Sequence, residues 1–232
     1  MTAAPRRPRR GSSSLAAVFT AELLHSAAVT AASSRSFERS SGASAVVVGI
    51  GGFLYSIAFV ILTRSSPETG RFLSALFLLL GGVVGIQVLA AVYRRLREVD
   101  AGFALVAFMF GFAGALGSAL HGAYDLANLT HPPTSPFTDF PNAVDPRGVL
   151  TFGLSGLALI VVARLMTRGG GFPRGLALLG YLSGILLVLI YLVRLIVFDP
   201  TSPLLLGPAA LEGFIVNPVW YVWLGLTFWR GS

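Results

Sequence analysis

Six long apolar runs are the feature that most constrains how this chain can fold. They cover residues 43–63, 72–93, 103–127, 148–166, 175–198 and 213–229. A helix rises about 1.5 Å per residue, so each run is close to the roughly 20 residues that cross about 30 Å of hydrocarbon. The runs lack the polar–apolar alternation of a membrane β-strand. Because a helix satisfies its own backbone hydrogen bonds in lipid, we predict an all-α bundle of six transmembrane helices.

The composition of the chain supports a membrane environment. Of its 232 residues, 54% are hydrophobic and only 12% are charged, with a mean hydropathy of +0.76. A soluble domain carries about 25% charged residues. The net charge of +7 arises from arginines that mostly flank the apolar runs, which is the pattern of charges that orient membrane helices. The lipid bilayer is therefore the predicted partner, and we expect no nucleic-acid partner.

The distribution of arginine predicts the orientation of the bundle. If the N-terminus is inside, 13 arginines lie inside and four lie outside. The four are Arg64, Arg71, Arg147 and Arg194, which we call the outer arginines. The chain contains arginine but no lysine, which is typical of a GC-rich bacterial genome. We therefore predict a multi-pass protein of the bacterial inner (cytoplasmic) membrane with both termini in the cytoplasm.

The chain divides into two predicted parts. Residues 1–42 form a polar N-terminal segment rich in Arg and Ser, and residues 43–232 form the six-span membrane domain. Within the first part, one side of a helix would carry Leu15, Val18, Phe19 and Leu23, which is typical of an interfacial helix. A disordered tail is the alternative interpretation. Because the segment is polar, Ser-rich and outside the apolar runs, we predict that it is dispensable for folding.

Two further patterns concern how the spans are related and how they pack. The stretch from Thr63 resembles the stretch from Thr167, which suggests a weak inverted repeat of three plus three spans, as in many secondary transporters. The pairs Gly81/Gly85, Gly180/Gly184 and Gly114/Ser118 have the four-residue spacing of small residues that lets helices approach closely. Such Gly-rich faces predict packing within the bundle, or contact with a second copy or another membrane protein.

A polar stripe ends the third apolar run. It consists of Ser118, His121, Asp125 and Asn128, with Tyr124 beside them. Spacings of three and four residues place these side chains on one face of a helix. Ionisable groups at membrane depth are costly and usually face the bundle interior or a water-filled cavity. The alternative is that the helix simply leaves the membrane here.

Other polar residues fall at the same predicted membrane level. They are Arg147, Arg194, Glu212 and Asn217. The alternative for Arg194 is a side chain that reaches the lipid headgroups. Together with the stripe, they predict a ligand-binding cavity that faces the outside. Two Pro-rich loops, 128–148 and 198–213, lie on the same side and are either binding loops or simple connections.

Several chemistries are excluded by residue type. The absence of Cys excludes thiol catalysis, iron–sulfur clusters and Cys-based zinc sites, and the absence of Lys excludes a Schiff base and a Walker-type phosphate loop. Only His121 is well placed for a metal, with His131 in the loop as a helper, so we predict neither a metal nor another cofactor. Haem held by two His ligands is excluded for the same reason. Gly153–Gly156 matches the short serine motif of rhomboid proteases, but the sixth run has no His to activate the serine.

Four sequence motifs carry a resemblance to a known group of proteins. They are GIGGFLY, HGAYDLAN, DPRGVLTF and NPVWYVWLGL, within residues 43–229. On these motifs the chain resembles a six-span bacterial integral membrane protein family that is defined as a domain of unknown function. The resemblance implies the fold and the membrane location only. HGAYD is also similar to the His/Asp pairs of intramembrane metallohydrolases such as alkaline ceramidases.

The leading functional hypothesis is an integral membrane protein that binds or transports a small molecule or lipid through the outward-facing polar cavity. One alternative is a membrane-embedded hydrolase that uses His121 and Asp125. Another is a non-catalytic membrane subunit or regulator. The first is favoured because ionisable residues gather at one end of an otherwise apolar bundle.

Overall fold

The computed structural model describes the backbone of residues 12–130, 145–197 and 202–231, and the side chains of these ranges from residue 33 onward. The first three spans are built from α1 (Ser12–Ser56) with η1 (Ile57–Leu62) and α2 (Thr63–Ser65), then α3 (Pro67–Leu96), then α4 (Ala101–Thr130). The last three are η2 (Pro146–Gly148) with η3 (Val149–Leu154) and α6 (Ser155–Arg168), then α7 (Arg174–Ile196), then α8 (Pro203–Leu211) with η4 (Glu212–Val216) and α9 (Asn217–Arg230).

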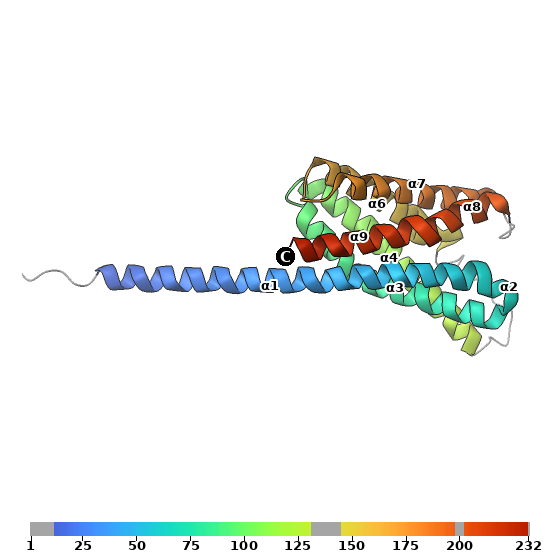
Figure 1. Cartoon of the computed structure of the whole chain (residues 1–232), viewed down its shortest axis with the longest axis horizontal. Coiled ribbons are helices and arrows are strands. Elements are labelled where there is room, and N and C mark those ends of the chain that lie inside the picture. The colour runs from blue at the N-terminus through green and yellow to red at the C-terminus, as the bar shows by residue number, and fades with distance from the viewer. Residues whose placement is uncertain (1–11, 131–144, 198–201, 232) are drawn as a thin grey trace, which may run out of the picture.

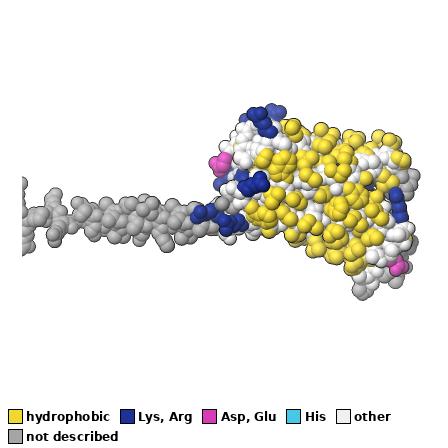
Figure 2. All heavy atoms as spheres, viewed as in Figure 1, with side chains coloured by type: hydrophobic (Ala, Val, Ile, Leu, Met, Phe, Trp, Pro, Cys, Tyr) yellow, Lys and Arg dark blue, Asp and Glu magenta, His cyan; other side chains and the backbone are white. Residues whose placement is uncertain are grey.

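These elements confirm the predicted all-α fold. Six helical stretches are long and apolar enough to cross a membrane, and no strand occurs in the described ranges. Large apolar side chains such as Val83, Met109 and Leu178 are more than half exposed on the outside of the bundle. Figure 2 shows this apolar surface with arginines gathered at its two ends. An apolar belt between charged ends is the surface expected of a multi-pass membrane protein.

The six spans form a ring in chain order. The span of α1 packs against α3, α3 against α4, α4 against α6, and α6 against α7. The last span contacts α7 through α8 and η4, and α9 closes the ring by packing against α1 (Figure 1). One end of this ring, where α3, α6 and α9 end, is filled by the main hydrophobic core, and we call it the closed end. Its core includes Leu96, Leu165, Leu176, Leu224 and Phe228.

Some of the glycines that were predicted to allow close helix packing do so, and others do not. A Cβ added to Gly156 would lie 2.7 Å from the carbonyl oxygen of Gly184, and one added to Gly184 would lie 2.7 Å from that of Gly156. The prediction of close packing is thus confirmed for Gly184, and also for Gly180 and Gly114, whose added Cβ atoms would meet Trp220 and Ser155. It is wrong for Gly81 and Gly85, because a Cβ at either position would meet nothing within 4 Å. On α3 it is the intervening Gly82 that lets α4 approach.

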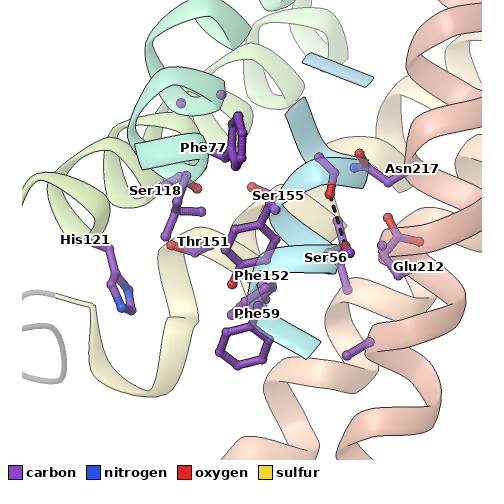
Figure 3. Close-up of a pocket in the computed structure, with 18 of the residues that line it drawn as sticks. Ser56, Phe59, Phe77, Ser118, His121, Thr151, Phe152, Ser155, Glu212 and Asn217 are labelled. Atoms are coloured by element: carbon purple, nitrogen blue, oxygen red, sulfur yellow. Dashed lines mark hydrogen bonds between the residues drawn. The ribbon is translucent and has the colours of Figure 1, made fainter. Parts of the chain in front are cut away.

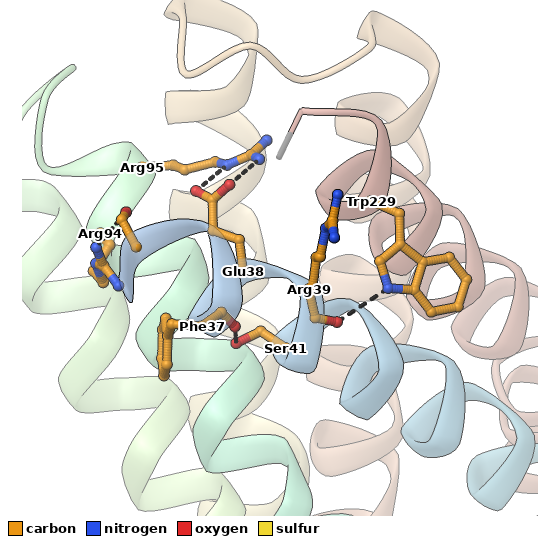
Figure 4. Close-up of polar contacts among 8 residues, drawn as sticks. Phe37, Glu38, Arg39, Ser41, Arg94, Arg95 and Trp229 are labelled. Atoms are coloured by element: carbon orange, nitrogen blue, oxygen red, sulfur yellow. Dashed lines mark hydrogen bonds and ion pairs between the residues drawn. The ribbon is translucent and has the colours of Figure 1, made fainter. Parts of the chain in front are cut away.

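The closed end also anchors a part of the predicted N-terminal segment (Figure 4). The Glu38 carboxylate accepts two hydrogen bonds from Arg95, at 3.0 and 2.8 Å. The Trp229 indole donates to the Arg39 carbonyl oxygen at 3.0 Å. Through these contacts the last residues of the segment hold α1 against α3 and α9, and the dispensability of the segment for folding stays a prediction. The division of the chain at residue 42 stays a prediction, and the side chains of the predicted interfacial helix lie outside those described.

Candidate functional site

A large cavity lies toward the end of the ring opposite the closed end, which we call the cavity end. Its volume is about 1120 Å³, and all six spans contribute to its wall. Along α3 the wall runs from Arg71 to Val92, which corresponds to about 30 Å of helix. Arg64 and Arg71 lie near the ends of their helices, whereas Val88, Val92 and Trp220 line the deep part beside the core. The ring therefore encloses a long, deep chamber.

Three of the six spans leave α-helical geometry where they line this cavity. The π-helical segments are η1, η3 and η4, and each contributes wall residues, including Phe59, Phe152 and Glu212. In η4 a physical cause is visible, because Pro218 follows it and lacks the N–H that a regular helix would use. Short π segments inside α-helices are often found at functional sites because they redirect side chains.

The start of the fourth span is fixed by a buried carboxylate. Asp145 is 2% exposed and accepts hydrogen bonds from the backbone N–H groups of Leu150 at 2.6 Å and Thr151 at 3.2 Å. It thus caps N–H groups that the helix itself leaves without acceptors. Arg147, at φ 56°, and Gly148, at φ 83°, make the sharp entry that this cap requires. A non-glycine residue in this region is strained, and here it places Arg147 on the cavity wall.

One side of the cavity carries the polar stripe of α4. The Nε2 atom of His121 lies 3.6 Å from the Asp125 carboxylate, one helical turn away. The other ring nitrogen, Nδ1, is buried and has no hydrogen-bond partner among the described residues, and the same holds for Oγ1 of Thr151. Figure 3 shows His121, Ser118 and Thr151 together on this side. This side of the cavity therefore holds two buried polar atoms without a partner in the described part of the chain.

The opposite side carries a buried acidic residue. Glu212 is 4% exposed, and its Oε1 atom accepts a hydrogen bond of 2.5 Å from the Ser183 hydroxyl of α7. Asn217 and Ser56 lie beside Glu212 in Figure 3. The Ser56 hydroxyl donates to the Gly52 carbonyl oxygen of its own helix at 3.0 Å. The sequence did not single out Ser183, because a serine between glycines in an apolar run resembles an ordinary packing residue.

The structure brings most of the predicted site residues to one cavity. Eight of the nine line it: Ser118, His121, Asp125, Asn128, Arg147, Arg194, Glu212 and Asn217. Tyr124 does not, because it follows His121 by three positions and so lies about 60° around the helix from it, on the side away from Asp125. Arg194 is held over the ring of Phe152, with 5.4 Å from its guanidinium carbon to the ring centre. That the eight residues bind a ligand stays a prediction.

The cavity also has wall residues that the sequence analysis missed. They include Tyr55, Ser56, Ser74, Thr151 and Ser155. Single small polar residues in apolar runs give no periodic signal, so only the packing of the six spans identifies them.

The geometry limits the chemistry of the site. No group of three or more His, Cys, Asp or Glu side chains is placed to hold a metal in the part of the chain that the structure describes. The Ser118 hydroxyl donates to the Gly114 carbonyl oxygen at 3.0 Å, so it is not engaged with His121. His131 and most of the loop 128–148 lie outside the described residues, as does the start of the loop 198–213. The hydrolase hypothesis is left with the His121–Asp125 contact alone.

No protein-family model, curated protein or solved structure matches the chain in the comparisons.

Proposed function

We propose that this protein binds a small or lipid-like molecule inside the cavity, as a binding or transport protein of the membrane. The observation that carries the proposal is a chamber of about 1120 Å³ enclosed by six spans. Ligand sites commonly have volumes of about 300–1,000 Å³. Protein interiors are otherwise close-packed, and an unfilled cavity lowers stability. A ring of helices that keeps so large a chamber is therefore best explained by a molecule that occupies it.

The wall of the chamber supports an amphipathic occupant. Its deep part is formed by apolar side chains such as Val88, Val92 and Trp220, and its charged residues lie mainly toward the cavity end. An occupant with one polar end and one apolar end would match both regions. Transport of such a molecule would need a second state of the bundle, so binding is the step that can be tested directly.

The test uses Trp220 as a reporter of the deep part of the cavity. Trp220 is 3% exposed, so lipid or detergent outside the bundle has little access to it. In the full chain carrying Trp223→Phe and Trp229→Phe, it is the remaining tryptophan. We expect an uncharged brominated monoacylglycerol, added to the protein in maltoside micelles, to quench its fluorescence in a saturable manner.

Two glycine variants separate binding in the cavity from contact at the outer surface. Gly81→Leu would project into the cavity, because Gly81 lines it and a Cβ there meets nothing within 4 Å. Gly51 also has open space at its Cβ but is not part of the cavity wall, so Gly51→Leu is the matched control. We expect quenching to be strongly reduced by Gly81→Leu and unchanged by Gly51→Leu. Equal quenching in both variants, or none in the parent, would contradict the proposal.

A further inference from the structure

We propose that the ligand is an amphiphile with an anionic phosphate or carboxylate head, which the outer arginines hold at the cavity end while the chain fills the deep part. This inference rests on the proposed function and adds the chemical class and the orientation of the ligand.

The first observation is where the outer arginines lie. Arginines on the outer side run against the charge bias that orients the bundle, so orientation alone does not account for them. All four of them line the cavity. They come from different elements, with Arg64 in α2, Arg71 in α3, Arg147 in η2 and Arg194 in α7. The four arginines that the charge bias does not explain therefore line one cavity, because the spans that carry them pack together.

The second observation is the balance of charge in the wall. Besides the outer arginines, the charged wall residues are Asp125 and Glu212. Glu212 is buried and engaged with Ser183, and Asp125 lies 3.6 Å from His121. Among the described residues, the cavity wall itself therefore carries more positive than negative side chains. Guanidinium groups bind phosphate and carboxylate through paired hydrogen bonds, so an anionic head complements this surplus.

The third observation is how the arginines and their neighbours are held. Arg194 is supported by the Phe152 ring, and Arg147 is fixed by the strained turn that Asp145 caps. Two of the four outer arginines are therefore held in place at the cavity wall.

The fourth observation is that three serine hydroxyls in the wall are already engaged and that the wall extends far along α3. The hydroxyls of Ser56, Ser74 and Ser118 each donate to a carbonyl oxygen of their own helix. The stretch of α3 from Phe77 to Val92 lines the cavity over about 20 Å. An acyl chain in one leaflet spans about half of the 30 Å hydrocarbon core, or roughly 15 Å. The deep part is therefore long enough for one acyl chain.

The experiment compares brominated probes that share one acyl chain and differ in their heads. The protein is the full chain with Trp220 as its remaining tryptophan, in maltoside micelles. The probes are a monoacylglycerol, a lysophosphatidylcholine and a lysophosphatidic acid. We expect lysophosphatidic acid to reach half-quenching at a concentration at least tenfold below that of the monoacylglycerol, with lysophosphatidylcholine in between. Hydrogen bonds to a charged group correspond to about a tenfold change in affinity each.

Arginine variants then locate the head group. Arg147→Gln and Arg194→Gln should each lower the affinity for lysophosphatidic acid about tenfold. Neither should change the affinity for the monoacylglycerol. Arg230→Gln, an exposed arginine at the closed end, is the control for general attraction by the charge of the protein, and it should change neither probe. An equal loss of affinity for lysophosphatidic acid in Arg230→Gln would overturn the inference, because the preference for the anionic probe would then come from the net charge of the protein.

The remaining outcomes separate this inference from the proposed function. Equal affinity for the three probes would overturn the anionic head and leave binding in the cavity intact. Absence of quenching by any probe would overturn both. Inorganic phosphate at millimolar concentration should compete only weakly with lysophosphatidic acid. Displacement at concentrations similar to those of the lipid would show that a free phosphate, not an amphiphile, is the ligand.

Discussion

At the scale of single residues, this protein handles its buried polar groups in two ways. Asp145 and Glu212 are almost fully buried, and each accepts hydrogen bonds from a group on a different turn or helix. His121 Nδ1, Thr151 Oγ1 and the second carboxylate oxygen of Glu212 are instead buried with no partner in the described part of the chain. A polar group without a partner in an apolar medium is costly, so the first kind stabilises the fold and the second kind marks the candidate site.

Two buried serines allow us to test whether the hydrogen bond to the buried Glu212 carboxylate stabilises the fold. Ser183→Ala removes the donor to the buried Glu212 carboxylate, so we expect the free energy of unfolding to fall by about 1.5–3 kcal/mol. Ser74→Ala is the control, because the Ser74 hydroxyl donates only to the Arg71 carbonyl oxygen of its own helix. We expect its free energy of unfolding to change by no more than about 0.5 kcal/mol. Thermal unfolding in detergent measures both. A Ser183→Ala protein as stable as the control would contradict the role given to this hydrogen bond.

At the scale of the elements, neighbouring helices either touch through glycine or stand apart around the cavity. Gly156 and Gly184 bring the backbones of α6 and α7 together, whereas Gly81 and Gly85 on α3 face open space. The π-helical segments belong to the spans of α1, α6 and α9. Each of them lies at the level of the cavity, not at the level of the closed end. The same residue type thus closes one helix pair and leaves room for a ligand beside another helix.

A single methyl group distinguishes these two uses of glycine. In Gly156→Ala the new Cβ would lie 2.7 Å from the Gly184 carbonyl oxygen, so α6 and α7 must separate, and we expect a loss of about 1–3 kcal/mol. In Gly81→Ala the methyl group enters open space, and the better helix propensity of Ala should add about 0.5–1 kcal/mol. Unfolding temperatures of the two variants, measured side by side in one detergent, should therefore move in opposite directions. Destabilisation by Gly81→Ala would show that its face is packed.

At the scale of the whole molecule, the two ends of the ring differ in construction. The closed end is filled by the core and tied by Glu38 and Arg95, and the other end holds the cavity and the outer arginines. The arginine bias predicts that the closed end faces the cytoplasm. The cavity would then receive its ligand from the outer side of the membrane or from its outer leaflet.

Cysteine labelling tests this orientation with little interference, because the chain has no Cys of its own. Ser66→Cys lies between α2 and α3 at the cavity end, and Thr167→Cys lies at the end of α6 at the closed end, both at exposed positions. We expect a membrane-impermeant maleimide to label Ser66→Cys in intact cells and Thr167→Cys only after the membrane is permeabilised. The reverse pattern would place the cavity on the cytoplasmic side.

The sequence by itself determined the number of spans, their approximate limits and the face of α4 that carries Ser118, His121, Asp125 and Asn128. These are local properties, because apolar length and a period of 3.6 residues are set within one helix. Only the tertiary structure decided that Glu212 meets Ser183, 29 positions away, that Gly81 faces a cavity, and that Tyr124 does not. Only it showed that residues 34–41 hold α1 to the bundle. Such outcomes depend on how close each pair of helices comes and how the ring closes, which are set by contacts between residues far apart in the chain.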